Sequence, residues 1–272
     1  MIDCDYTHYI NAIKDQLNVT PSKWIFKSMP NYQGVLEHVD KSTGDRYFNE
    51  IKIRYTNLFK DNKKLLELLC SENDYFGTPQ KYYFDDFAYC SPTNIRYILH
   101  SFLILEYIQK LNLNHLDIIE IGGGYGGLCF FINKLSCVFN ITISTYTIFD
   151  LLEASKLQEK YLSNLNVKNS YFYQLDKFEN LKQNSFLISN YAFSEISLEL
   201  QKQYSAKIIK PFTSTGILCW NHNPVYQFID KKINIDKAFR VNNSKIFSLG
   251  YDLTNYEITD KNNWIEECVV TY

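Results

Sequence analysis

The sequence lacks the cysteine spacings of a metal site or a disulfide framework. Its seven cysteines are widely separated and odd in number, and no two of them form a C-x-x-C pair. This pattern excludes a small disulfide-stapled fold and the common zinc sites, and it predicts a reducing, cytoplasmic location. We predict no other metal either, because the adjacent Asp85 and Asp86 are more typical of a solvated loop than of an octahedral oxygen site.

Long hydrophobic runs and runs of one charge are absent as well. Residues 1–11 lack the basic start and the apolar stretch of a signal peptide. The most apolar helical stretch, residues 95–108, carries Arg96, His100 and Glu106, so it predicts a buried core helix and no transmembrane segment. With 28 basic residues, 30 acidic residues and a formal net charge of -2, the chain lacks the basic surface typical of a nucleic-acid-binding protein.

The chain divides into two parts with different sequence patterns. Its 272 residues, 46% of them hydrophobic, suffice for one large domain or for one domain with an added cap. In the first hundred residues apolar side chains recur at steps of three and four, which predicts helices. We therefore predict an N-terminal helical cap over residues 1–92 and an α/β domain over residues 93–272, the latter beginning with a helix over 93–110.

From residue 117 onward, short apolar strands alternate with amphipathic helices. This alternation predicts a mostly parallel sheet wrapped by helices, with ligands at the carboxyl ends of the strands. Residues 251–272 predict a terminal antiparallel hairpin. The predicted strands are 116–121, 141–150, 169–175, 184–190 and 215–221, and the predicted helices between them are 126–136, 151–164 and 197–209.

The segment IIEIGGGYGGL, residues 118–128, places five glycines between the first of these strands and its helix. Gly122, Gly124 and Gly127 match the G-x-G-x-x-G of dinucleotide-binding loops. Gly122, Gly124 and Gly126 match the G-x-G-x-G of S-adenosylmethionine-binding loops. Glycines permit positive φ and let the backbone approach a ligand at a helix N-terminus. The glycines alone leave both ligands open, together with a plain glycine-rich turn.

Acidic residues lie at the ends of the first two predicted strands, and the first of them separates the two ligands. Glu120 lies two residues before Gly122, where it would repel a pyrophosphate but suits a ligand with an ammonium and a sulfonium group, such as S-adenosylmethionine. Asp150 ends the second predicted strand, where an acid can accept hydrogen bonds from both ribose hydroxyls. The alternative for Asp150 is an N-cap of the helix over 151–164. Glu120 thus favours S-adenosylmethionine over a dinucleotide, whereas a ribose contact at Asp150 suits either ligand.

Polar residues also end the third and fourth predicted strands. Asp176 follows the third strand, where it could reach the adenine amino group, and Asn190 ends the fourth. Because the carboxyl ends of parallel strands share one edge of the sheet, we expect both side chains beside the same pocket. For both residues the alternative is an ordinary solvated position at a strand end.

The segments around these residues resemble a known family. IIEIGGGYGGL, the FDLLEASKLQEKYL after the second strand, the NYAFSEIS after the fourth and the upstream SPTNIRYILHSFLIL are similar to the sugar O-methyltransferases, which are class I enzymes. The resemblance covers about residues 89–222, whereas the first eighty residues show none. It implies a Rossmann-like, seven-stranded and mostly parallel sheet whose last strand is antiparallel.

The resemblance also implies ligands. S-adenosylmethionine would be the cosubstrate, S-adenosylhomocysteine the product and a sugar hydroxyl the acceptor. Many enzymes of this class dimerise, which leaves a homodimer open. The residues implied at the cosubstrate are Glu120, Gly122, Gly123, Gly124, Gly126, Asp150 and Leu151.

A sugar hydroxyl is a poor nucleophile near neutral pH, so a nearby group should take its proton. Glu195, after the fourth strand, and His222, after the fifth, are the candidate bases, with a first-turn helix acid and a plain loop histidine as their alternatives. Arg96 is a candidate clamp for the methionine carboxylate, with a surface salt bridge as its alternative. His100, on the same helix, fits a buried core histidine better than a catalytic one.

These observations predict an S-adenosylmethionine-dependent O-methyltransferase that acts on a sugar or nucleotide-linked sugar in surface-glycan biosynthesis. One alternative keeps the cosubstrate but has a non-sugar acceptor, such as a phosphorylated small molecule or an amine. The other is a dinucleotide-binding oxidoreductase or a catalytically silent binding module.

Overall fold

The computed structural model describes residues 6–221, 245–248 and 267–271. The N-terminal part is helical, as predicted, and it also contains a small antiparallel hairpin that the sequence pattern did not predict. Its helices are α1 (Thr7–Leu17), α2 (Pro30–Gln33), α3 (Lys41–Arg54) and α4 (Thr56–Asp74), with 3-10 turns at Pro21–Lys23 and Phe26–Ser28, and the hairpin pairs β1 (Tyr82–Tyr83) with β2 (Tyr89–Cys90).

The predicted core helix is α5 (Pro92–Lys110), and its side chains are buried on most of its circumference. Pro92 occupies its first turn, where the missing backbone N–H costs nothing because that donor has no intrahelical partner. The apolar side chains of α5 therefore pack inside the protein, as expected. Within the described residues, no helix has the length and the apolar character needed to cross a membrane.

The α/β part is built on one seven-stranded sheet with the order β5-β4-β3-β6-β7-β9-β8. The first five strands in this order are parallel, and β9 runs antiparallel to both of its neighbours. This arrangement confirms the predicted fold class. The strands are β3 (His115–Ile121), β4 (Thr142–Phe149), β5 (Ser170–Tyr173), β6 (Ser185–Asn190), β7 (Thr213–Asn221), β8 (Lys245–Ser248) and β9 (Glu267–Thr271).

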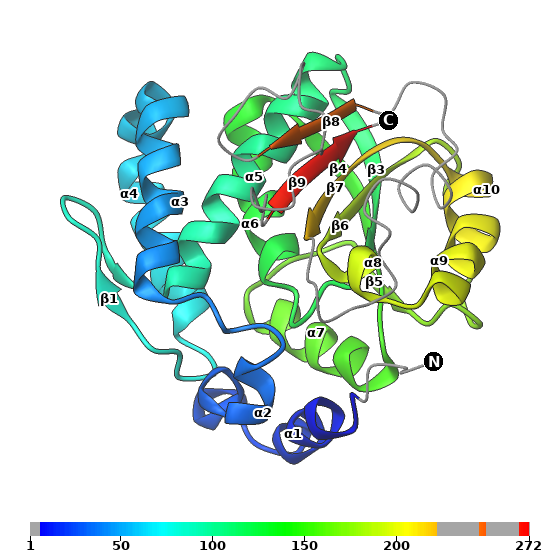
Figure 1. Ribbon diagram of the computed structural model, residues 1–272, viewed down its shortest axis with the longest axis horizontal. Helices are drawn as coiled ribbons and strands as arrows, with labels where there is room; N and C mark the ends of the chain where they lie inside the picture. Colours follow the sequence, from blue (N-terminus) through cyan, green and yellow to red (C-terminus); the bar gives the residue numbers. More distant parts are fainter. Residues whose placement is uncertain (1–5, 222–244, 249–266, 272) are drawn as a thin grey trace, which may run out of the picture.

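Helices cover both faces of the sheet, because the strands alternate apolar side chains between two separate core clusters. Ile118 of β3 belongs to the cluster that includes α5, α6 (Gly127–Leu135) and α7 (Leu152–Asn164). Its neighbour Ile119 belongs to the cluster that includes residues of α9 (Leu198–Tyr204). Figure 1 shows α5 and α6 on one side of the strands, with α9 and α10 (Lys210–Phe212) on the other.

The predicted helix over 197–209 is divided in the structure. A short α8 (Ala192–Glu195) precedes α9, and a π-helical turn, Ser205–Ile209, joins α9 to α10. Of the predicted C-terminal hairpin, residues 251–272, the structure describes β9, which pairs with β8, a strand that precedes the predicted hairpin. The rest of the predicted hairpin lies outside the described residues.

The N-terminal part and the sheet share one hydrophobic core. Phe26 packs against Tyr125 of the glycine-rich loop with ring centroids 5.5 Å apart. Phe76 packs against Tyr161 of α7 at 5.8 Å. The N-terminal helix α1 also lies beside α7, as Figure 1 shows. The division of the chain at residue 93 stays a prediction.

Candidate functional site

The glycine-rich loop leaves β3 at the topological switch point of the sheet. Strand order reverses between β3 and β6, which is where open α/β sheets bind their ligands. Gly122 continues the pairing by donating to the Phe149 carbonyl at 2.8 Å, and its φ of 76° is a value that side chains disfavour. A Cβ on Gly122 would lie 2.0 Å from the Cβ of Ala192. The loop therefore needs glycine here to fit against the carboxyl end of β6.

Asp150, directly after β4, holds this loop in place. Its Oδ2 accepts hydrogen bonds from the Gly124 backbone N–H at 3.1 Å and from Gln158 at 2.8 Å, and its Oδ1 accepts one from the Leu151 backbone N–H. Burial raises the pKa of Asp150 from 3.8 to about 6, against the lowering effect of these hydrogen bonds. The N-cap interpretation was wrong, because Leu151 is the N-cap residue of α7.

Glu120 lies on β3 directly beneath the loop. Its side chain is 1% exposed, and its Oε2 accepts a hydrogen bond from the Tyr146 hydroxyl at 3.0 Å. The same oxygen lies 3.2 Å from where a Cβ on Gly123 would sit. Burial raises the pKa of Glu120 from 4.5 to about 8. A contact between Glu120 and a ligand stays a prediction.

Arg96 of α5 approaches the loop from the other side. The surface salt-bridge alternative was wrong, because the side chain is 5% exposed and donates to the Leu36 carbonyl at 3.1 Å. Leu36 in turn covers the loop, since its Cδ1 lies 2.9 Å from where a Cβ on Gly124 would sit. The Arg96 guanidinium also stands 5.8 Å from the Tyr191 ring centroid, at the end of β6. Its role as a carboxylate clamp stays a prediction.

The carboxyl end of β6 carries a strained residue. Tyr191 follows Asn190 with φ 72°, an unusual value for a bulky side chain and one that is often found at functional sites. The Asn190 Oδ1 is buried and has no hydrogen-bond partner among the described residues. The Tyr191 hydroxyl pairs with His100 Nε2 at 3.2 Å, and burial lowers the pKa of His100 to about 3. His100 is therefore a neutral core histidine, as expected.

The remaining predicted residues are less closely connected to the loop. Leu151 is 37% exposed beside Asp150. The third strand ends at Tyr173 and not at Asp176, whose side chain is 84% exposed and forms an ion pair with Lys207 at 2.6 Å. Glu195 is half-buried on α8, and His222 lies outside the described residues. Roles for Asp176, Glu195 and His222 stay predictions.

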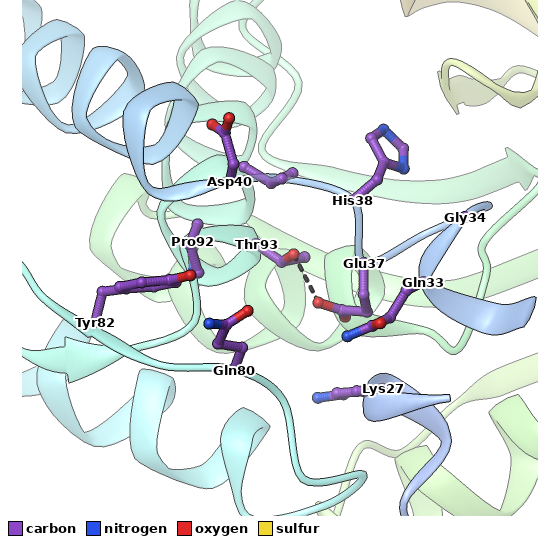
Figure 2. Close-up of a pocket in the computed structure, with 11 residues that line it drawn as sticks. Lys27, Gln33, Gly34, Glu37, His38, Asp40, Gln80, Tyr82, Pro92 and Thr93 are labelled. Carbon is purple, nitrogen blue, oxygen red and sulfur yellow. Dashed lines mark hydrogen bonds between the residues drawn. The ribbon is translucent and has the colours of Figure 1, made fainter. Parts of the chain in front are cut away.

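A cavity of about 300 Å³, here called the Lys27 cavity, lies in the N-terminal part (Figure 2). Sequence reasoning missed its residues, because none of them belongs to a recognisable motif. The only available signal was a lysine and a glutamate, Lys27 and Glu37, set among aromatic and apolar residues. Its polar lining includes Lys27, Gln33, Glu37, Gln80 and Thr93.

No group of three or more His, Cys, Asp or Glu side chains in the described part of the chain is arranged to hold a metal ion. No family model matches the chain, and no curated protein does.

Solved structures that are similar to the chain include several methyltransferases. A geranyl diphosphate C-methyltransferase from Streptomyces coelicolor is 10% identical, with a TM-score of 0.46 over 66% of this chain and 77% of that one. The YcgJ protein from Bacillus subtilis is 16% identical, with a TM-score of 0.33 over 47% of this chain, which spans only 54% of the Bacillus protein. PKMT2 from Rickettsia typhi is 17% identical, with a TM-score of 0.32 over 41% of this chain and 22% of that one. Such low similarity carries no argument about what this chain binds.

Proposed function

We propose that this chain is an S-adenosylmethionine-dependent O-methyltransferase that methylates a hydroxyl of a sugar or nucleotide-linked sugar. The proposal depends on one observation: Asp150, the acidic residue directly after β4, accepts a hydrogen bond from the Gly124 N–H of the glycine loop at 3.1 Å. Both residues lie next to the switch point of the sheet. This is where the adenosyl and methionyl parts of the cosubstrate would be held.

The residues at this edge fit such a cosubstrate. Asp150 Oδ1 accepts a hydrogen bond from the Leu151 N–H, and it can accept a further one from a ribose hydroxyl without displacing the loop. Leu151 offers exposed apolar surface for an adenine ring. Two of the buried polar atoms that have no partner among the described residues suit a methionyl group: Arg96 Nε can donate to its carboxylate, and Asn190 Oδ1 can accept from its ammonium. Methyl transfer from a sulfonium is an in-line displacement, so the chain's main contribution would be positioning.

A dinucleotide is the second candidate ligand, and Glu120 is the reason to keep it. With its pKa raised to about 8, this buried carboxyl is mostly protonated at neutral pH in the free protein. A neutral carboxyl would not repel a pyrophosphate, so the charge argument from the sequence is weaker in the folded chain. A ligand with an ammonium or sulfonium group would instead favour the ionised carboxylate.

Calorimetric titration of the intact protein with S-adenosylhomocysteine and, separately, with NADH distinguishes the two ligands. We expect saturable one-to-one binding of S-adenosylhomocysteine and none of NADH. Binding of NADH alone would assign the loop to a dinucleotide. Binding of neither ligand would contradict both proposals.

The acceptor is tested by incubating the protein with S-adenosylmethionine and a panel of nucleotide sugars, followed by mass spectrometry. A sugar O-methyltransferase gives a product heavier by one methylene group. The base candidates are tested in the same assay. If Glu195→Gln and His222→Ala both retain full activity, neither residue is needed to deprotonate a hydroxyl. A non-sugar acceptor then becomes the better proposal.

A further inference from the structure

The Lys27 cavity contains a buried ammonium group with unused hydrogen-bonding capacity. Lys27 is 1% exposed, and its Nζ donates to the Asn73 carbonyl at 2.6 Å. The same Nζ stands 4.3 Å from the centroid of the Tyr125 ring. An ammonium carries three donors, so two remain beyond the bond to Asn73. A charged group this deeply buried is costly unless something in the cavity solvates it.

A carboxylate with one free oxygen faces the same cavity. Glu37 Oε2 accepts a hydrogen bond from the Thr93 hydroxyl at 2.7 Å, whereas Oε1 is buried and has no partner among the described residues. Figure 2 shows the Lys27 amine, the Gln33 amide and the Glu37 carboxylate directed into the same space. The cavity thus offers a donor and an acceptor close together.

This pairing of charges selects a class of ligand. An anion would be attracted by Lys27 but repelled by Glu37. A cation would be attracted by Glu37 but repelled by Lys27. A hydroxyl group both donates and accepts, so a neutral ligand with neighbouring hydroxyls can satisfy Glu37 Oε1 and Lys27 at once. Tyr82 and Pro92 line the same cavity and offer apolar surface to the carbon face of a ring. About 300 Å³ suits a single ring-sized unit.

The cavity and the cosubstrate loop lie on two sides of one short segment. Leu36 covers Gly124 of the loop, while the next residue, Glu37, lines the cavity. Arg96 donates to the Leu36 carbonyl, and Thr93, three residues earlier on α5, donates to Glu37. The cavity and the loop are therefore separated by the thickness of this segment alone.

We propose that the Lys27 cavity binds a neutral, polyhydroxylated unit of the acceptor, with one hydroxyl donating to Glu37 and another accepting from Lys27. That this unit belongs to the methyl acceptor rests on the proposed function, whereas its binding in the cavity does not. This unit is not the one that is methylated, because Leu36 stands between the cavity and the loop. Its contribution is binding energy from a remote part of the substrate.

Saturation-transfer NMR on the full chain tests this assignment with defined probes. D-glucose, D-galactose and L-rhamnose represent neutral polyols, inorganic phosphate represents an anion and ethanolamine represents a cation; phosphate binding is followed by competition. The variants are Glu37→Gln and Lys27→Met. The matched controls are Glu199→Gln and Lys23→Met, which replace exposed residues. Circular dichroism and titration with S-adenosylhomocysteine are run on every variant, so that misfolding and cosubstrate loss are seen separately.

We expect saturation transfer to at least one sugar with the wild-type protein and both controls, and a loss of at least several-fold with Glu37→Gln and Lys27→Met. If Lys27→Met does not fold, Glu37→Gln alone decides. No transfer to any sugar, equal transfer in the cavity variants, or preference for phosphate or ethanolamine would overturn the proposal. If the wild-type protein does not bind S-adenosylhomocysteine, the proposed function is wrong, but the result on sugar binding in the cavity is unaffected.

Discussion

The Asp150 carboxylate accepts a hydrogen bond from the Gly124 backbone N–H, at 3.1 Å between Oδ2 and N. This contact ties the end of β4 to the glycine loop after β3, and Gln158 of α7 reinforces it by donating to the same oxygen and to the Gly124 carbonyl. The acid therefore shapes the loop, and in the proposed function it also binds the ribose hydroxyls. Removing it should affect the binding of ligand more than the stability of the fold.

We expect Asp150→Ala to abolish measurable S-adenosylhomocysteine binding. The variant loses a ribose hydrogen bond and the Gly124 hydrogen bond that shapes the loop, each to a charged acceptor and each contributing about 1.5–3 kcal/mol, so affinity should fall on the order of a hundredfold or more. Calorimetric titration provides the measurement. Asp15→Ala, which replaces an exposed acid on α1, is the control and should bind like the wild type. Unchanged binding by folded Asp150→Ala would remove this residue from the ligand site.

Because Glu120 is buried, we expect the affinity for S-adenosylmethionine to depend on pH. In the free protein its pKa is about 8, so it carries a proton at lower pH. If it contacts the cationic part of S-adenosylmethionine, binding requires loss of that proton, and affinity falls about tenfold for each pH unit below 8. The ratio of wild-type to Glu120→Gln affinity should therefore rise as the pH is raised from about 6 to 8. The ratio cancels titration of the ligand itself. A flat ratio would show that Glu120 supports the loop without contacting the ligand.

Because Lys27 is buried, we expect an unusual dependence of the protein's stability on pH. Burial lowers its pKa from 10.5 to about 8, so the unfolded chain binds this proton more tightly than the folded chain. Stability is therefore reduced by this group below pH 8 and recovers as the pH rises from about 8 to 10.5. Between about pH 7 and 9.5 the wild type should gain roughly 2 kcal/mol relative to Lys27→Met.

Urea unfolding of both proteins at several pH values measures this difference. Comparison with Lys27→Met cancels the titration of the tyrosines and acids that the two chains share. Lys23→Met, at an exposed position nearby, should show no such change relative to the wild type. A constant difference between wild type and Lys27→Met would mean that Lys27 keeps an ordinary pKa in the folded chain.

The strands and the cosubstrate loop could be predicted because their signals are local. Short apolar runs bounded by glycine or polar residues identify β3, β4 and β6 within a few residues, and parallel strands bring their carboxyl ends together whatever the details of packing. The contact between Asp150 and Gly124 follows from that geometry. Asp176 shows the limit of this reasoning, because a turn in which Gln174 pairs with Lys177 ends β5 early and leaves the acid exposed.

The Lys27 cavity could not be predicted, because it depends on contacts between distant segments. Lys27 is hydrogen-bonded to Asn73, which is 46 residues away in the sequence, and Glu37 is hydrogen-bonded to Thr93, which is 56 residues away. No local sequence pattern predicts such pairs. A charged residue in a short segment between helices is expected to be exposed to solvent unless its neighbours in space are known. The resemblance to sugar O-methyltransferases did not extend to these residues, so it gave no help either.

Gly122→Ala tests whether the loop depends on glycine at the switch point. The new methyl group would lie 2.0 Å from Ala192 Cβ, at a backbone φ of 76°. Left-handed strain costs about 1–2 kcal/mol and overpacking about 1–3 kcal/mol, so we expect a loss of stability of about 2–5 kcal/mol in urea unfolding, together with loss of S-adenosylhomocysteine binding. Gly34→Ala is the matched control, because Gly34 has an ordinary φ of -60° and its Cβ would meet only the Pro30 carbonyl at 3.6 Å. It should change stability by less than about 1 kcal/mol. Equal effects of the two substitutions would show that Ala192 moves aside and that the loop tolerates a side chain where it approaches β6.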